Sequence, residues 1–314
     1  MPPRLRIGSR PSRLALAQAE IIRRRLEQAA PGLVCEIVPI RTTGDKLTTP
    51  SLAQVGGKGL FVRELEQALE AGRIDIAVHS MKDIPAVLAP RFCLLAVPAR
   101  EDSADVLLSG GADLAALPRA ARLGTSSLRR RFEALRLRPD LDIQPLRGNI
   151  DTRLARLGAG EFDAIILAAA GLRRLGQTGL PPAHRLSEDD FVPAGGQGAL
   201  AIEGLADGVP GGASEIESAV RALDDLRARL EVSAERAFLG QIGASCASPI
   251  GVKATTDSDE FKIRALLFSL DGARSMTELM SSPLTSEVAA AERTGVELAR
   301  RMLARGAAEL IGDA

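Results

Sequence analysis

The segment Ala121-Arg-Leu-Gly-Thr-Ser-Ser-Leu-Arg-Arg-Arg-Phe-Glu-Ala-Leu-Arg-Leu137 decides the fold class. It begins with a short apolar run that is typical of a buried strand, and small polar residues follow that run. Ser126 or Ser127 can then cap a helix from Leu128 to about Leu137, because a Ser side chain accepts a hydrogen bond from a free N–H of the first turn. A strand that leads through a polar turn into a helix is the unit of parallel α/β sheets.

The same unit recurs along the first two-thirds of the chain. Short apolar runs alternate with segments whose apolar residues recur at helical spacing, and Gly or Pro often ends these segments. This alternation predicts parallel sheets joined by right-handed crossovers. The expected strands cover residues 5–8, 33–40, 74–78, 92–97, 105–108, 121–123, 141–146, 162–168 and 199–203, and the expected helices cover residues 12–30, 60–71, 128–137, 149–157 and 169–175.

The pattern changes near residue 207 and predicts a third domain. Residues 207–214 form a linker rich in Gly and Pro. The strand before this linker is expected to return to the first of two α/β domains. Beyond the linker we expect a small α+β domain with helices at 215–230, 233–239 and 286–305 and strands near 250–254 and 262–270. The predicted domains are residues 1–98 with 197–213, residues 99–196, and residues 214–314.

The composition excludes several classes of function. The 314 residues include 40 basic and 40 acidic side chains, and this net charge of zero argues against general binding to nucleic acid or membrane surfaces. The chain has no Trp or Tyr, so it lacks the usual platforms for stacking nucleic-acid bases. It shows no signal-peptide pattern and no run that approaches 18 apolar residues, so we expect a cytoplasmic protein without a membrane span.

The three cysteines differ in their surroundings. No CxxC pair exists and only two His are present, so no zinc, iron–sulfur or other metal site is predicted. Cys35 and Cys93 lie in apolar runs and are expected to be inert residues of buried strands. Cys246 lies instead in Ile242-Gly-Ala-Ser-Cys-Ala-Ser-Pro-Ile250, a loop of small residues. The pattern alone leaves Cys246 open between an idle thiol and a nucleophile.

The expected strand ends carry a consistent set of polar residues. Ligands of open parallel sheets bind beyond the carboxyl ends of the strands, where helix N-termini favour anions. Arg strengthens that preference because it binds carboxylates in a two-point fork. Each motif alone is more typical of a helix cap or a solvated face, but their repetition predicts a cleft for a ligand with several carboxylates or phosphates. The ends are residues 8–10, 41–45, 79–83, 124–131, 147–149 and 171–174.

Phosphate-binding motifs are absent from the sequence. No G-x-x-x-x-G-K-[ST] occurs and no G-x-G-x-x-G follows a strand, while the loop around Lys58 is Gly-rich and basic.

Asp83, just past a buried strand, is the acid best placed to hold N–H groups and stabilise a cation. Its neighbour His79 is more typical of a core or cap residue. A triad of Ser80, His79 and Asp83 is not expected, because no nucleophile-elbow sequence is present.

Five motifs, in their order and spacing, resemble hydroxymethylbilane synthase (porphobilinogen deaminase), and the resemblance covers nearly the whole chain. They are Gly56-Gly-Lys-Gly-Leu-Phe61, Val78-His-Ser-Met-Lys-Asp83, Gly124-Thr-Ser-Ser-Leu-Arg-Arg130, Leu146-Arg-Gly-Asn149 and Ala194-Gly-Gly-Gln-Gly198. The resemblance implies two α/β domains like those of type II periplasmic binding proteins plus a small α+β C-terminal domain. It also implies an enzyme that joins four porphobilinogen molecules head to tail, with loss of ammonia, on a covalent dipyrromethane, and then hydrolyses the product.

The resemblance carries roles onto individual residues. It implies a thioether from the dipyrromethane to Cys246, with Asp83 stabilising the azafulvenium cation that forms when ammonia leaves. It implies no metal, and it favours a monomer. The implied catalytic residues are Asp83, Lys82 and Arg10; the cofactor contacts are Cys246, Asp83, Lys82, Ser80, Ser127, Arg129 and Arg130; the substrate contacts are Arg10, Gln18, Lys58, Arg147, Arg153, Arg174 and Gln197; and Asp45 is a further contact.

Two positions depart from the family pattern. Many members have an acid where Gly243 stands and a Lys where Gln54 stands, which predicts a changed loop before Cys246 and one cleft cation fewer. The alternatives to this enzyme are a binding module of the periplasmic type that holds a polycarboxylate without turnover, and a transferase for a phosphate ligand. The first gives Cys246 and Asp83 no evident role, and the second predicts competition by phosphate.

Overall fold

The computed structural model describes residues 3–46, 61–176, 182–208, 214–243 and 248–311, and these residues form three sheets. They divide into two compact units, Met1–Glu101 with Ala199–Val232, and Asp102–Gly198 with Ser233–Ala314. The first unit holds one five-stranded sheet, and the second holds another five-stranded sheet and a three-stranded sheet. This is the expected fold class: two α/β sheets and a small C-terminal α+β part. The three-domain boundaries stay a prediction.

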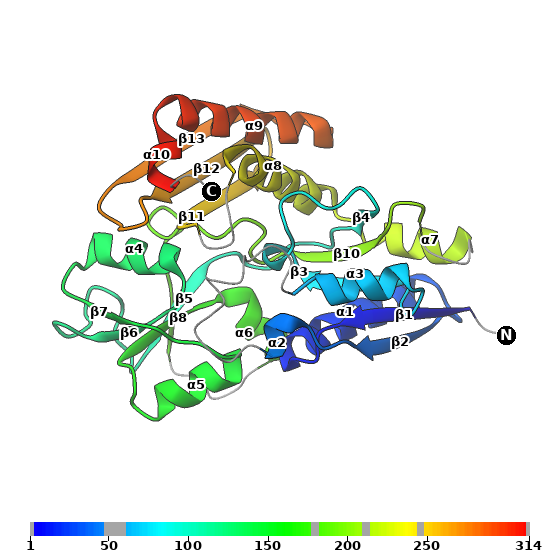
Figure 1. Ribbon diagram of the computed structural model, residues 1–314, viewed down its shortest axis with the longest axis horizontal. Helices are drawn as coiled ribbons and strands as arrows, with labels where there is room; N and C mark the ends of the chain where they lie inside the picture. Colours follow the sequence, from blue (N-terminus) through cyan, green and yellow to red (C-terminus); the bar gives the residue numbers. More distant parts are fainter. Residues whose placement is uncertain (1–2, 47–60, 177–181, 209–213, 244–247, 312–314) are drawn as a thin grey trace. The chain divides into compact units, whose positions relative to one another are not determined.

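The sheet of the first unit has the strand order β2-β1-β3-β10-β4 (Figure 1). β1 runs parallel to β2 and β3, whereas β10 runs antiparallel to β3 and β4. The strands are β1 (Arg4–Ser9), β2 (Val34–Pro39), β3 (Ile76–Ser80), β4 (Phe92–Ala96) and β10 (Leu200–Leu205). The helices are α1 (Arg13–Ala29), α2 (Thr43–Lys46), α3 (Arg63–Glu70) and α7 (Ser214–Arg221), with the short 3₁₀ turn η2 (Met81–Asp83) after β3.

Helices cover both faces of this first sheet. On one face Ile7 and Ile76 pack with Ile22 of α1 in a buried cluster that also includes residues of α7. On the other face Leu65 and Leu69 of α3 pack with residues of β3. The three layers explain why the strands read as continuous apolar runs, since a sheet that is buried on both faces needs no polar alternation.

The larger sheet of the second unit repeats the same strand arrangement. Its order is β7-β6-β8-β5-β9, with β6 parallel to β7 and β8, and with β5 antiparallel to β8 and β9. The strands are β5 (Asp105–Ser109), β6 (Arg122–Gly124), β7 (Asp142–Gln144), β8 (Ala164–Ala168) and β9 (Ala183–Arg185), and the helices are α4 (Leu128–Leu137), α5 (Ile150–Gly158) and α6 (Ala169–Leu175).

The C-terminal sheet is an antiparallel meander of three strands. It is formed by β11 (Ile250–Thr256), β12 (Glu260–Phe268) and β13 (Ser275–Pro283), with the helices α8 (Leu226–Ile242), α9 (Val288–Ala304) and α10 (Ala307–Ile311). Gly295 lets α9 cross α8 closely, because a Cβ at that position would lie 2.1 Å from the carbonyl oxygen of Ala234. Phe132 of α4 and Phe268 of β12 pack with their ring centroids 5.7 Å apart and their planes tilted by 44°, which joins this sheet to a helix of the larger sheet of the same unit.

Three sequence predictions about the fold were wrong. The large sheets are mixed, because the handedness rule applies only to strands joined by a helical crossover, and β5 and β10 enter their sheets in another way. The strands β9 and β13 were missed. The helix expected at 215–230 ends at Arg221 instead, because Asp225 accepts a hydrogen bond from the Ala228 N–H at 2.8 Å and so begins a new helix, α8.

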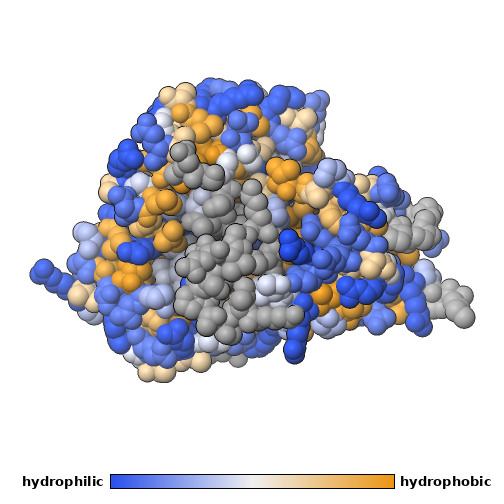
Figure 2. Space-filling view, viewed as in Figure 1, coloured by the Kyte–Doolittle hydropathy of each residue, from blue (hydrophilic) through white to orange (hydrophobic). Residues whose placement is uncertain are grey.

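Figure 2 shows hydrophilic side chains over most of the face in view, with smaller hydrophobic areas between them. None of the helices within the described residues is long and apolar enough to cross a membrane.

Candidate functional site

Arg10 stands at the centre of a polar group at the edge of the first sheet. β1 and β3 are parallel neighbours, so the residues after their carboxyl ends share one edge. The Arg10 side chain donates from Nε to Asp45 Oδ1 at 3.1 Å, and its Nη2 contacts the same oxygen. Its Nη1 lies 4.0 Å from Asp83 Oδ2, and its guanidinium stacks over Phe61 at 4.1 Å from the ring centroid. Arg10 is therefore held by three neighbours.

Asp83 is partly exposed between two buried anchors. Met81 is buried and its N–H donates to the carbonyl of Ala199 at 3.0 Å, while Ile84 is buried and its N–H donates back to the Met81 carbonyl at 3.1 Å. The side chain of Asp83 keeps 33% of its surface exposed. The turn η2 thus presents a carboxylate to solvent at a fixed place, and Lys82 beside it is also exposed.

Asp45 is the main counter-ion of Arg10. Burial raises the pKa of the Asp45 carboxyl, but hydrogen bonds from the Arg10 guanidinium and from Thr42 lower it further, so the net pKa lies below the ordinary value. An ionised Asp45 in direct contact with Arg10 takes up much of that cation's field. The Asp83 carboxylate lies 4.0 Å from Arg10, so Arg10 neutralises less of its negative charge than of the charge of Asp45.

Two further predicted residues of this unit, Gln18 and Ser80, are hydrogen-bonded to each other just before η2. Gln18 of α1 is buried, and its Nε2 donates to Ser80 Oγ at 2.9 Å. His79 was expected to be a core residue, and this is confirmed: it is buried, with Nε2 2.9 Å from Glu203 Oε2 of β10. Lys58 and Cys246 lie outside the described residues.

In the second unit, Arg129 and Arg130 converge on one buried carboxylate. Arg130 Nη2 donates to Asp105 Oδ1 at 2.7 Å, and Arg129 Nη1 lies 2.8 Å from Asp105 Oδ2. Arg129 Nη1 also donates to Glu133 Oε2 and to the carbonyl of Val192. Burial would raise the pKa of the Asp105 carboxyl, but the two guanidinium groups outweigh it and hold that pKa well below its ordinary value. Arg129 is thus largely engaged by the protein itself.

Glu133 is the second carboxylate of this cluster. Its burial, offset by Arg129 and reinforced by the negative Asp105, raises the pKa of the Glu133 carboxyl to about 8. Its Oε1 is buried and finds no hydrogen-bond partner within the described residues. Protonation of Glu133 near neutral pH would leave the cluster with a net positive charge, which favours a nearby anion.

Arg130 and Arg153 show the clearest capacity for an anion. Arg130 Nε is buried and has no hydrogen-bond partner among the described residues. Burial, and secondly the positive charge of Arg130, lower the pKa of Arg153 to about 10, although Arg153 Nε donates to the carbonyl of Gly148 at 2.9 Å. Because an Arg side chain stays charged in proteins, such a lowered pKa indicates a place where an added anion would be stabilised.

The other predicted residues of this unit lie on the same elements or beside them. Ser127 caps α4 by accepting from the Arg130 N–H, as expected. Gln197 is buried, and its Nε2 donates to Asp105 Oδ1 at 2.8 Å and to the carbonyl of Ser103 at 2.7 Å. Arg174 on α6 donates to the carbonyl of Gly198 at 2.5 Å, and Arg147 is exposed after β7.

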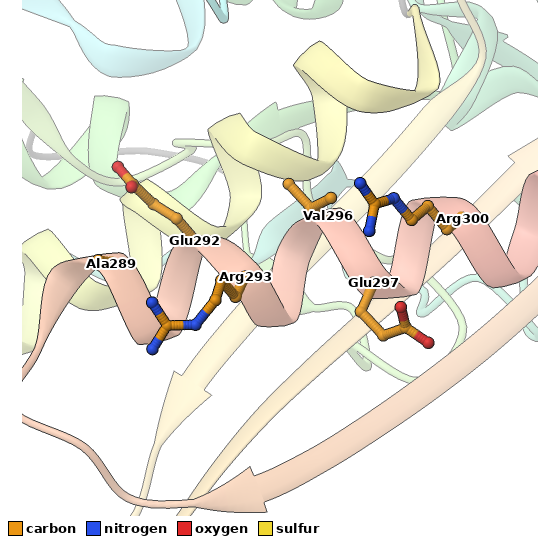
Figure 3. Close-up of a pocket in the computed structure, with 6 residues that line it drawn as sticks. All are labelled: Ala289, Glu292, Arg293, Val296, Glu297 and Arg300. Carbon is orange, nitrogen blue, oxygen red and sulfur yellow. The ribbon is translucent and has the colours of Figure 1, made fainter.

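Sequence reasoning missed Phe61, Asp105 and Glu133 as parts of the site. Asp105 opens an otherwise apolar strand, and a charged residue at such a position indicates a buried partner. Figure 3 shows the lining of a pocket elsewhere, on α9, which combines charged with small apolar side chains and includes none of the predicted site residues that the structure describes; its lining is Ala289, Glu292, Arg293, Val296, Glu297 and Arg300.

The fold and these two groups of residues define an α/β protein with arginine-rich polar groups beyond the ends of its strands and a partly exposed carboxylate in the first unit. A family model for "Porphobilinogen deaminase, dipyromethane cofactor binding domain" matches residues 5–209, and one for "Porphobilinogen deaminase, C-terminal domain" matches residues 229–304. The chain therefore belongs to the porphobilinogen deaminase family. It is a transferase of porphyrin biosynthesis.

Individual relatives agree with this assignment. A porphobilinogen deaminase of Syntrophotalea carbinolica is 45% identical over 308 residues, which cover 98% of this chain and 95% of the relative. One from Geobacter sulfurreducens is 42% identical over 314 residues, which cover 99% and 94%. Among solved structures, a periplasmic solute-binding protein from Desulfovibrio salexigens matches with a TM-score of 0.42 and 11% identity over 71% of this chain and 73% of that protein.

Proposed function

We propose that this chain condenses four porphobilinogen molecules head to tail, with loss of ammonia, on a dipyrromethane attached to Cys246 through a thioether. Hydrolysis then releases the linear tetrapyrrole hydroxymethylbilane. The observation that carries the proposal is the pair at the ends of β1 and β3, where the partly exposed Asp83 carboxylate lies 4.0 Å from an Arg10 that Asp45 already compensates.

The residues of the second unit fit the proposed cofactor. A dipyrromethane made from two porphobilinogen units bears acetate and propionate groups, which are planar carboxylates. The unpartnered Nε of Arg130 and the lowered pKa of Arg153 identify donors that a carboxylate would satisfy. We propose that Arg130, Arg153, Arg147, Arg174 and Ser127 hold such groups, and that Arg129 acts mainly by fixing Asp105. When bound, the dipyrromethane supplies the free α-carbon at which chain growth begins.

Asp83 is proposed as the catalytic carboxylate. Loss of ammonia from porphobilinogen leaves a cation conjugated with the pyrrole ring, and a fixed carboxylate beside the ring N–H stabilises that cation. Asp83 is suited to this because its turn is anchored on both sides and because Arg10, 4.0 Å away, is bound more closely by Asp45 than by Asp83. Arg10 would bind a substrate carboxylate, with Lys82 and Lys58 adding positive charge. Gln18, Ser80 and Gln197 are proposed as polar contacts.

The cell compartment and the assembly state are also proposals. We propose a monomer in the cytoplasm that takes porphobilinogen from solution and binds neither nucleic acid nor membrane. The equal numbers of acidic and basic residues support the absence of general nucleic-acid or membrane-surface binding.

Arg174→Ala is expected to lower kcat/KM for porphobilinogen about 10- to 100-fold, because a charged hydrogen bond contributes about 1.5–3 kcal/mol. Arg173→Ala is the matched control. Its side chain is more exposed and pairs with Asp102 at 3.1 Å, so that variant should stay within about twofold of the wild type. Initial rates of ammonia release at varied porphobilinogen concentration measure both. Equal rates in the two variants would remove Arg174 from the binding site.

A further inference from the structure

Glu235 joins the two elements on either side of the cysteine-bearing segment. It lies on α8 and its side chain is fully buried. Its Oε2 accepts from the Gly196 N–H at 2.6 Å, and its Oε1 accepts from the Ala254 N–H of β11 at 2.8 Å. Both bonds are charge-assisted and buried, which places them among the stronger hydrogen bonds of a protein.

The first of these bonds connects Glu235, through the segment 194–198, to the buried cluster of Asp105, Arg129, Arg130 and Glu133. Gly196 has a φ of 75° and belongs to the segment 194–198, in which the Gln197 N–H donates to the Ala194 carbonyl at 2.9 Å. The side chain of Gln197 donates to Asp105 Oδ1, which also accepts from Arg130. Glu235 is thus linked to Arg130 through one loop of five residues and one carboxylate.

The second bond holds the start of the C-terminal sheet. α8 ends at Ile242 and β11 begins at Ile250, so Cys246 lies in the short connection between them. The segment before Gly196 packs on both elements. A Cβ at Gly195 would lie 2.7 Å from Leu239 Cδ1 of α8, and the Val252 N–H of β11 donates to the Pro193 carbonyl at 2.8 Å. Little room is left for one of these segments to shift without the others.

We propose that Glu235 is a positioning residue that sets the two described elements flanking Cys246 in the sequence, α8 and β11, in register with Arg130. This inference rests on the proposed function, because the register matters only if Cys246 carries the growing chain. No other residue type supplies two strong acceptors in that space. A Gln at this position offers one oxygen, and its NH₂ would face an N–H donor.

The test compares Glu235→Gln with Glu231→Gln in the full-length holoprotein. Glu231 lies one turn earlier on α8 and is also buried, but it pairs with Arg100 and Arg227 and with neither Gly196 nor Ala254. Four quantities are measured: the adduct content by intact mass, kcat per adduct-bearing molecule, the melting temperature, and hydrogen–deuterium exchange of peptides over residues 192–198 and 250–256.

Glu235→Gln should lower kcat per adduct-bearing molecule about 10- to 100-fold and speed exchange in both peptides, since small misplacements of reacting groups cost this much. Glu231→Gln should change neither. A merely structural Glu235 would lower the melting temperature and leave kcat per adduct-bearing molecule unchanged, and that result overturns the proposal. An equal loss in both variants overturns it too.

If Glu235→Gln does not fold, Glu235→Asp tests the same positioning role. The shorter side chain keeps its charge but cannot reach both N–H groups at the observed distances, so the same two changes are expected at smaller size. A wild type that carries an adduct and turns over, beside an Asp variant that matches it, refutes only the role of Glu235. A wild type with no adduct after incubation with porphobilinogen refutes the proposed function and this inference together.

Discussion

Asp83→Asn is expected to retain its fold and its adduct and to lose turnover by at least about 100-fold, in the range found when one preorganised electrostatic group is removed from an active site. The substitution is nearly isosteric, and the anchors of the turn come from the backbone of Met81 and Ile84, which it does not touch. What disappears is the negative charge that would stabilise the cation left by ammonia. The variant is measured by rates of ammonia release per adduct-bearing molecule.

The control for this variant lies at the other end of the same strand. Asp75 precedes β3 and pairs with Arg6 at 2.6 Å, so Asp75→Asn removes a partly buried ion pair of the same sheet from its opposite edge. It should lower the melting temperature without changing turnover per adduct-bearing molecule. Turnover of Asp83→Asn close to that of the wild type would remove Asp83 from the mechanism.

Asp105→Ala is expected to destabilise the second unit by about 3–5 kcal/mol, the cost of leaving a buried charge without its partner. The change leaves the buried Arg130 guanidinium without its carboxylate partner and leaves Arg129 with one carboxylate partner instead of two. The folded-state pKa of Asp105 is depressed, so its contribution is fully present above the unfolded-state pKa of about 3.9 and is lost only as the pH falls through the folded-state value. The full penalty should therefore appear at pH 7.

Circular dichroism in urea measures this loss, because the chain has no Trp or Tyr for fluorescence. Glu161→Ala is the control. Glu161 pairs with Arg156 at 2.7 Å on the surface of the same unit, and exposed pairs contribute at most about 1 kcal/mol. If both variants lost the same small amount, the buried cluster would not be the anchor described above.

Local signals in the sequence pointed to the polar residues of the first unit better than to those of the second. The residues after β1 and β3 were predicted, as polar strand ends of a parallel sheet, to line a ligand cleft, and in the structure Arg10 and Asp83 lie 4.0 Å apart. Ser127 was one of two expected caps of α4 and is the actual one. Each of these predictions depends on geometry within one strand–turn–helix unit, which local sequence specifies.

The features that were missed depend on distant parts of the chain. In the sequence, Asp105 is the first residue of a mostly apolar strand. Its two arginine partners lie on α4, and only the folded chain brings that helix next to β5. β13 alternates exposed and partly buried residues, so its apolar positions are too few to be seen as a strand without its partner β12. The antiparallel entry of β5 and β10 follows from the path of the whole chain and leaves no local pattern.

The most direct test of the central claim is the intact mass of the denatured wild-type protein beside its Cys246→Ser variant, each before and after incubation with porphobilinogen. The proposed function predicts an added mass of two linked porphobilinogen units on the wild type and none on the variant. A bare wild-type chain that gains the adduct on incubation would agree equally, because it would be an apo preparation. A wild type that stays bare with porphobilinogen, or a variant that carries the same adduct, would contradict the covalent dipyrromethane on Cys246.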